Sequence, residues 1–183
     1  VADLCLSIRP GNCFGLLGPN GAGKTTTMSM LTGTTWSTSG TATVADIGIE
    51  EDMPAIYRRL GFCPQFYGLF PKMTVDEHLE FYGQLKGMQE QAINSFVIDL
   101  TRAMEMTEHR SKLSSQLSGG NKRKLSMAIS LMGLPQVLIL DEPSAGVDPS
   151  ARANIVEILK QVKMQPGANR CIVLTTHLME EAE

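Results

Sequence analysis

Short apolar runs along the chain predict a set of β-strands. Residues 4–8 alternate between apolar and polar side chains, which is typical of a strand with one buried face. Residues 13–17 predict a buried strand, and Val137–Leu140 is aliphatic throughout, as in a parallel strand that is covered on both faces. Shorter strand candidates lie at residues 41–45, 62–63 and 171–175.

Longer segments between these runs have the spacing of helices. Residues 74–77 form a capping box, in which Thr74 caps a helix and Glu77 reaches back to it. Asp52 can cap another helix that ends before Gly61. Because strands alternate with helices, the sequence predicts an α/β fold with a mainly parallel sheet. Further helices are expected near residues 24–31, 89–106, 119–132 and 149–163.

One domain with a helical insertion fits the length and order of these elements. The chain has 183 residues, close to the size of a single domain. Residues 66–117 show helical spacing without strand patterns, so we expect a helical subdomain there, inserted into a core of residues 1–65 and 118–183. The chain starts almost inside a strand candidate and stops in the first turns of a predicted helix at Met179–Glu183. We therefore expect residues 1–183 to be a fragment, truncated at both ends, of a longer protein.

Composition narrows the class of protein. Hydrophobic residues make up 43% of the chain, and charged residues make up 19%, which argues against a disordered chain. The net charge of -3 is a poor match for binding nucleic acid through charge. No apolar run reaches the roughly 18 residues that would span a bilayer, and no signal peptide opens the chain. Four cysteines form no CxxC pair and have no histidine at metal-ligand spacing, so we expect free, mostly buried thiols in a reducing compartment: Cys5, Cys13, Cys63 and Cys171.

A glycine-rich segment between the strand at residues 13–17 and the helix at 24–31 predicts a nucleotide site. Residues 18–25 fit the pattern GxxxxGK[ST] in the strand-loop-helix context that this pattern requires. Glycines let backbone N–H groups curl around phosphate oxygens, and the helix N-terminus adds partial positive charge. Lys24 would reach the β- and γ-phosphates, Thr25 would bind Mg²⁺, and Thr26 would donate to the α-phosphate. The candidate phosphate-binding residues are Gly18, Pro19, Asn20, Gly21, Ala22, Gly23, Lys24, Thr25 and Thr26.

Two acidic residues follow the apolar strand at Val137–Leu140. Asp141 and Glu142 lie where that strand ends, and ligands of open parallel sheets bind at the carboxyl ends of the strands. Asp141 can hold Mg²⁺ through water, and Glu142 can act as a general base on an attacking water. An exposed pair of acidic residues without function is the alternative, and the phosphate loop at Lys24 argues against it.

A second phosphate-binding surface is predicted at Ser118-Gly119-Gly120-Asn121. A hydroxyl and two glycines open a helix there, and one domain does not need two such surfaces for one γ-phosphate. The surface would therefore serve a nucleotide held by a different domain. The alternative is a capped helix start without a ligand.

Together these motifs resemble the nucleotide-binding domain of ATP-binding cassette (ABC) transporters, in the family's order and over nearly the whole chain. Gln65 matches the Q-loop, residues 118–121 match the signature, residues 144–148 match the D-loop, and His177 matches the switch histidine. The segments at residues 15–26, 118–126 and 146–149 are similar to the A subfamily, which consists mainly of lipid exporters and flippases, with a few importers. The resemblance implies a P-loop NTPase fold with a RecA-like core.

The resemblance also implies roles for the matching residues. Glu142, His177 and Gln65 would be catalytic, and Mg²⁺ would be held by Thr25, Gln65 and Asp141. The signature residues Ser118, Gly119, Gly120 and Asn121 would bind ATP held by a second cassette, and Asp148 would cross the dimer interface. A coupling helix of a transmembrane domain would dock near Gln65–Pro71. The chain would thus be an ATPase on the cytosolic face of a membrane, within a transporter that moves lipid.

Several segments leave alternatives open. Asn121 stands where most ABC families have Gln, and Trp36 is a poor substitute for the adenine-stacking aromatic expected upstream of the first strand. Residues 122–124, Lys-Arg-Lys, predict a solvated helix face, with contact to acidic groups across a dimer as the alternative. Residues 66–71 form an apolar, aromatic loop, which favours the groove for the coupling helix over local core.

Other functions compete less well. A soluble ABC ATPase acting on DNA or ribosomes would carry a long coiled-coil arm, and Gln65 and Ser118 are only 53 positions apart. A catalytically silent cassette with a regulatory role is disfavoured by the presence of Lys24, Asp141, Glu142 and His177. A GTPase is excluded because the chain has no NKxD sequence.

Overall fold

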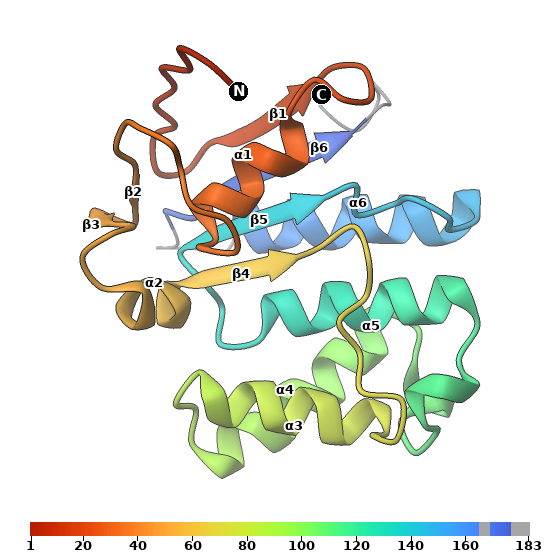
Figure 1. Cartoon of the computed structure of the whole chain (residues 1–183). Helices are drawn as coiled ribbons and strands as arrows, with labels where there is room; N and C mark the ends of the chain where they lie inside the picture. Colours follow the sequence, from red (N-terminus) through yellow and green to blue (C-terminus); the bar gives the residue numbers. More distant parts are fainter. Residues whose placement is uncertain (165–168, 177–183) are drawn as a thin grey trace.

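A four-stranded parallel sheet forms the centre of the computed structural model, which describes residues 1–164 and 169–176 (Figure 1). Its strands lie in the order β1-β6-β5-β4, and each neighbouring pair is parallel. The predicted α/β class with a mainly parallel sheet is therefore confirmed. The strand bounds are β1 Cys13–Leu17, β4 Leu60–Cys63, β5 Val137–Asp141 and β6 Cys171–Thr176.

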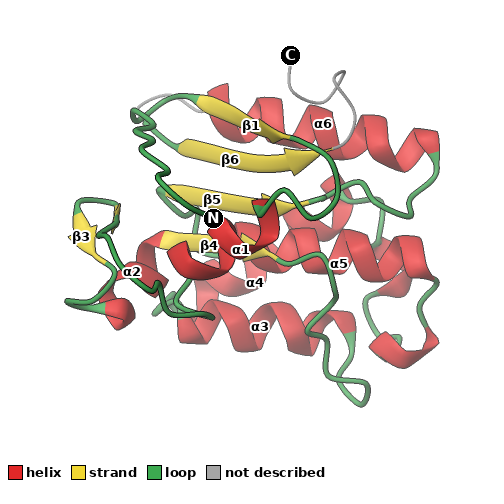
Figure 2. Ribbon diagram, turned by 45° about the horizontal axis from the view of Figure 1, so that its top comes forward, coloured by secondary structure: helices red, strands yellow, loops and turns green. Residues whose placement is uncertain are grey.

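Helices cover both faces of this sheet, because its central strands are apolar on both sides. On one face, Met28 of α1 (Lys24–Leu31) packs with Ile139 and Val173. On the other face, Leu138 and Leu140 pack with buried residues of α5 (Gly119–Leu131) and α6 (Pro149–Met164). Figure 2 shows α1 on the near side of the strands and α6 behind them.

Two further helices lie beyond α5, away from the sheet (Figures 1 and 2). These are α3 (Val75–Leu85) and α4 (Glu90–Ala103), followed by the short 3₁₀ turns at Thr107–His109 and Ser114–Gln116. Their buried side chains belong to the same apolar cluster as α5 and one face of the sheet. No strand forms between β4 and α5, apart from an isolated antiparallel bridge between Thr74 and Leu113.

Local caps fix the ends of two helices as the sequence predicts. The Asp52 carboxylate accepts the backbone N–H of Ala55 at 2.9 Å and opens α2 (Met53–Arg59). At α3, the Thr74 hydroxyl accepts the N–H of Glu77 at 3.2 Å, and the Glu77 carboxylate accepts the N–H of Thr74 at 2.6 Å. These donors from Thr74 also hold the pKa of the Glu77 carboxyl below its ordinary value.

We expect Thr74→Ala to lower the free energy of unfolding by about 1 kcal/mol, because the first turn of α3 loses its acceptor. Urea denaturation of the folded protein measures this change. Ser95→Ala is the matched control, since the Ser95 hydroxyl bonds back to the Gln91 and Ala92 carbonyls inside α4 and caps no helix end. Equal stability of Thr74→Ala and wild type would show that the capping box contributes nothing.

Three strand and burial predictions were wrong. Residues 4–8 form no strand; the segment has no ladder partner among the described residues and exposes Leu4 and Leu6. β1 is a strand at the edge of the sheet and is only partly buried, with Leu17 exposed. The four thiols are free, as predicted, but only Cys63 is buried. Alternating polarity alone does not make a strand, because a strand also needs a hydrogen-bonded neighbour.

The β-rich segment at residues 41–45 contributes a short strand outside the main sheet. β2 (Thr43–Val44) pairs with β3 (Ile47–Gly48) as a small antiparallel hairpin. The helix predicted at residues 179–183 lies outside the described residues. Among the helices that the structure describes, none has both the length and the apolar character needed to cross a bilayer.

Candidate nucleotide-binding site

The phosphate loop lies between the end of β1 and the start of α1. Gly21 and Gly23 have φ values of 81° and 95°, a left-handed conformation that glycine adopts without steric cost. Gly23 is the N-cap of α1, and no side chain caps the helix there. The backbone N–H groups of the first turn are therefore left to bind an anion.

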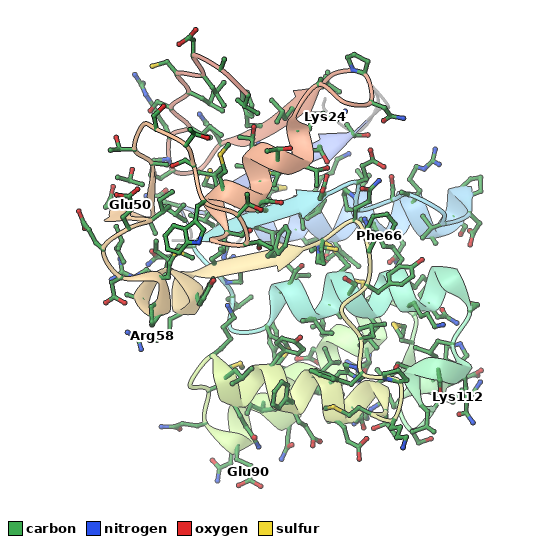
Figure 3. All side chains as sticks on the ribbon, viewed as in Figure 1. Lys24, Glu50, Arg58, Phe66, Glu90 and Lys112 are labelled. Atoms are coloured by element: carbon green, nitrogen blue, oxygen red, sulfur yellow. The ribbon has the colours of Figure 1, made fainter. Side chains whose placement is uncertain are left out.

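Lys24 places its charge at the centre of this loop. Its side chain is buried, and Nζ donates to the carbonyls of Gly18 at 2.6 Å and Pro19 at 3.1 Å. Figure 3 shows Lys24 at the turn between the loop and α1. Thr25 and Thr26 are exposed, while the Thr27 hydroxyl bonds back to the Gly23 carbonyl at 3.0 Å. A buried ammonium beside free N–H groups suits a polyphosphate.

Asp141 ends β5 as a buried carboxylate with a fixed orientation. The Thr175 hydroxyl of β6 donates to Asp141 Oδ1 at 2.5 Å and accepts the backbone N–H of Glu142 at 2.9 Å. The register pairs Asp141 with Thr175 and Leu17 with Thr176, so β1, β6 and β5 end at the same edge of the sheet. Thr175 is thus a positioning side chain that the sequence analysis did not assign; its place at the end of a central strand was the available signal.

Glu142 is held in a strained backbone conformation next to the Q-loop residue. Its φ is 50°, which costs a non-glycine residue on the order of 1–3 kcal/mol and persists only where neighbours hold it. Its Oε2 accepts a hydrogen bond from Gln65 Nε2 at 3.3 Å. Two of the three predicted catalytic residues are therefore in contact. The third, His177, lies outside the described residues, directly after Thr176 of β6.

The signature segment lies at the start of α5, with Ser118 and Gly119 exposed and Gly120 and Asn121 half-buried. The Ser118 hydroxyl accepts the N–H of Asn121 at 3.3 Å, so this residue does cap the helix. A methyl group at Gly120 would meet nothing within 4 Å, and one at Gly119 would approach only the Tyr67 hydroxyl, at 3.8 Å. The capping alternative thus holds for the Ser118 side chain, and the surface beside it is open to a further ligand.

Asp148 caps α6 in a similar way and is exposed. Its Oδ1 accepts the N–H of Ala151 at 3.0 Å, and this bond holds the pKa of the Asp148 carboxyl below its ordinary value. Asp148 is therefore a carboxylate on the surface, as a contact to a second protein molecule would require.

Comparisons with known proteins decide the family. The sequence model of the family described as ABC transporter matches residues 1–145. The chain belongs to the ABC transporter family. This result confirms the resemblance drawn from the motifs and identifies an ATP-binding cassette of the ABC ATPase type.

The relatives of this ABC cassette confirm the subfamily. The chain is 44% identical over 183 residues to the human retinal-specific phospholipid-transporting ATPase ABCA4. The alignment covers 100% of this chain and 8% of that protein. It is 45% identical over 185 residues to ABC transporter A family member 12 of Arabidopsis thaliana, covering 100% of this chain and 20% of that protein. It is 45% identical over 183 residues to the phospholipid-transporting ATPase ABCA3 of Mus musculus, in an alignment that covers 100% of this chain and 11% of that protein. The chain thus spans no more than about a fifth of these relatives.

Solved structures confirm the cassette fold. "Dimeric Structure of MJ0796, a Bacterial ABC Transporter Cassette" superposes with a TM-score of 0.88 at 23% identity, covering 97% of this chain and 79% of that one. "Structure of ATP binding subunit of ABC transporter" gives the same TM-score at 25% identity, covering 97% and 72%. The family model and the A-subfamily relatives favour the transporter cassette over the soluble ATPase and the silent cassette.

The basic run on the signature helix of the cassette is not a solvated face. Arg123 is 1% exposed and Lys124 is 8% exposed, so that prediction was wrong. Arg123 points into the site and donates to the carbonyls of Pro64 before Gln65, of Asp141 at the end of β5, and of Pro143. Lys124 pairs with Glu105 at 3.2 Å. The reason is that α5 packs on both the sheet and α3, which leaves it few solvent-facing positions.

The aromatic loop after Gln65 lies beside a cavity of about 610 Å³. Phe66 is 82% exposed, whereas Leu69 packs against the main apolar cluster, so the local-core alternative holds for Leu69 only. Buried His78 anchors the far end of the loop, because its Nε2 accepts the Phe70 N–H at 2.9 Å while its Nδ1 bonds the Thr74 carbonyl at 2.7 Å. The cavity lies apart from the phosphate loop, and its lining includes Tyr57, Phe62, Leu69, Lys86, Ile129 and Ser130.

Proposed function

We propose that this cassette binds and hydrolyses Mg-ATP together with a second cassette, and that the cycle drives transport across a membrane. The single observation that carries the proposal is the meeting of Gln65 with Glu142 beside the buried Asp141, at the sheet edge where the phosphate loop begins. The core would comprise residues 1–65 and 118–183, with residues 66–117 as the helical subdomain.

ATP would be held by the phosphate loop. The free N–H groups before α1 and the Lys24 ammonium would bind the β- and γ-phosphates, and the Thr26 hydroxyl the α-phosphate. The fit to Mg²⁺ rests on oxygen donors, which this cation prefers: the Thr25 hydroxyl, the Gln65 amide and the buried Asp141 carboxylate. The bound ion would neutralise charge on the phosphates, while Thr175 keeps Asp141 in place.

Hydrolysis would depend on Glu142 as the general base. Its carboxylate would accept a proton from the water that attacks the γ-phosphorus, while the bond from that phosphorus to the β–γ bridging oxygen breaks and ADP is the leaving group. The proton would then pass from Glu142 to the phosphate or to solvent. Gln65 orients this carboxylate in the structure and would exchange that contact for the γ-phosphate and Mg²⁺. His177 would hold the γ-phosphate and position the water.

A second cassette would complete each site. Ser118, Gly119, Gly120 and Asn121 would face the γ-phosphate bound by the partner, and Asp148 would cross the interface. The open surface beside Gly120 and the exposure of Asp148 support this arrangement. The dimeric state named for the MJ0796 cassette supports it as well.

A transmembrane domain would dock at the cavity beside residues 65–71. A coupling helix there would touch Phe66 and reach Gln65 within one residue, so that motion at the γ-phosphate passes to the membrane. The cassette would then lie on the cytosolic face. Lipid is the proposed substrate class, since the mammalian relatives are named phospholipid-transporting ATPases. No nucleic acid is involved, in line with the net charge of -3.

We expect Ser118→Arg to leave ATP binding unchanged and to abolish ATP-dependent association of two cassettes, because the large side chain fills the surface meant for the partner's phosphate. Analytical ultracentrifugation with Mg-ATP measures the association. Ser95→Arg adds the same side chain on an exposed turn of α4 and should associate normally. Association of Ser118→Arg at the wild-type level would remove the signature from the interface.

A further inference from the structure

Arg123 uses every donor of its guanidinium inside the site. Nε donates to the Pro143 carbonyl at 2.9 Å. Nη1 donates to Pro64 at 2.6 Å and Gln65 at 3.2 Å. Nη2 donates to Asp141 at 2.7 Å and also to Glu142. A guanidinium has five N–H groups in a rigid plane, and all five are matched by five main-chain carbonyls.

These five carbonyls belong to two segments that meet only in the folded chain. One segment follows β4 and carries Gln65, and the other runs from Asp141, the last residue of β5, through Glu142 to Pro143. Arg123 itself lies on α5, five residues after Ser118 of the signature. One buried side chain therefore joins the signature helix to the Q-loop and to the acidic residues at the end of β5.

Arg123 also helps to hold Glu142, the residue of the site with a strained backbone. Glu142 has a φ of 50°, its N–H is held by the Thr175 hydroxyl, and its carbonyl is held by Arg123. The peptide units on both sides of Glu142 are thus fixed, which sets where its carboxylate meets Gln65. An ammonium has only three donors and no planar fork, so lysine cannot satisfy the same five carbonyls.

We propose that Arg123 is a positioning residue for ATP hydrolysis, which fixes Gln65 and Glu142 relative to the signature helix of the same cassette. The inference rests on the proposed function. In that function Gln65 and Glu142 serve the cassette's own ATP, while the start of α5 serves the ATP of the partner. Arg123 is then a direct physical link between the two ATP sites of the dimer.

The test uses Arg123→Lys in the full-length protein that contains this cassette. We expect kcat for ATP hydrolysis to fall at least tenfold while the Kd for a fluorescent ATP analogue changes less than threefold. The reason is that the guanidinium of Arg123 bonds to none of residues 18–26, which form the phosphate loop of the same cassette. Arg170→Lys is the matched control, because Arg170 is also a buried arginine that donates to a carbonyl, that of Val162 at 2.9 Å, away from the site. Its kcat should stay within twofold of wild type.

A second readout does not depend on activity. In Arg123→Lys without nucleotide, the backbone amides of residues 65–67 and of Glu142, Ser144 and Ala145 should exchange with deuterium at least tenfold faster than in wild type, while those of α4 should be unchanged. Should Arg123→Lys not fold, Arg123→Gln replaces it, since it removes the buried charge and keeps two donors; the same split between kcat and Kd is expected.

The outcomes separate the two proposals. Unchanged kcat and unchanged amide exchange in Arg123→Lys would overturn the positioning role, as would equal losses of kcat in the Arg123 and Arg170 variants. Wild-type protein that hydrolyses no ATP would overturn the proposed function instead, and faster amide exchange in Arg123→Lys would still support the contact between the signature helix and the two loops.

Discussion

Glu142→Gln should lower kcat for ATP hydrolysis by about 10²–10⁴-fold and leave ATP bound, because an amide cannot accept the proton of the attacking water. The substitution preserves the size of the side chain, and an amide oxygen can still accept the bond from Gln65 Nε2, which is 3.3 Å long in the structure. Binding of ATP should therefore stay within a fewfold of wild type. Steady-state hydrolysis and equilibrium binding, measured on the same preparation, check both parts.

Glu90→Gln is the matched control for that variant. Glu90 is an exposed residue at the start of α4, far from Lys24 of the phosphate loop (Figure 3), and its replacement should leave kcat unchanged. Near-normal turnover in Glu142→Gln would remove Glu142 as the general base.

Lys24→Ala should weaken ATP binding by roughly 30- to 150-fold, or about 2–3 kcal/mol. The reason is the loss of charge-assisted hydrogen bonds to two phosphates by an ammonium that is buried in the loop. The carbonyls of Gly18 and Pro19 also lose their donor, so the loop itself should become less ordered. Isothermal titration with Mg-ATP measures the change in Kd.

Lys112→Ala controls for the loss of a positive charge. Lys112 is exposed and lies at the other end of the molecule from Lys24 (Figure 3), so its replacement should leave the Kd within twofold of wild type. If Lys24→Ala binds ATP as tightly as wild type does, Lys24 makes no contact with the phosphates.

Elements governed by local chemistry could be predicted from the sequence. The capping box at Thr74 and the cap at Asp52 each depend on residues three positions apart, so their partners are visible in the chain itself. β5 could be predicted because its run of aliphatic residues is buried on both faces. By contrast, residues 4–8 have the alternation of a strand but no ladder partner among the described residues, and alternation carries no information about partners.

The residues of the candidate site also fall into those that a short motif predicts and those that depend on contacts between distant segments. Lys24, Asp141 and Glu142 were predicted because each follows a strand within a short motif. The role of Arg123 could not be predicted, because it arises from contacts between segments that are far apart in sequence. For Thr175 the available signal was its place at the end of a strand, which does not name its partner Asp141. Arg123 bonds to carbonyls of Pro64 and Gln65, 59 and 58 positions away, and main-chain acceptors leave no trace in side-chain identity.

The mass in solution of the isolated Glu142→Gln cassette, with and without Mg-ATP, tests the composite site most directly. Because this variant should hold ATP without consuming it, we expect a dimer with Mg-ATP and a monomer without it. Addition of Ser118→Arg should return the protein to a monomer that still binds ATP. A monomer in saturating Mg-ATP, with ATP bound to Glu142→Gln alone, would contradict a site built from Lys24 of one copy and Ser118 of another.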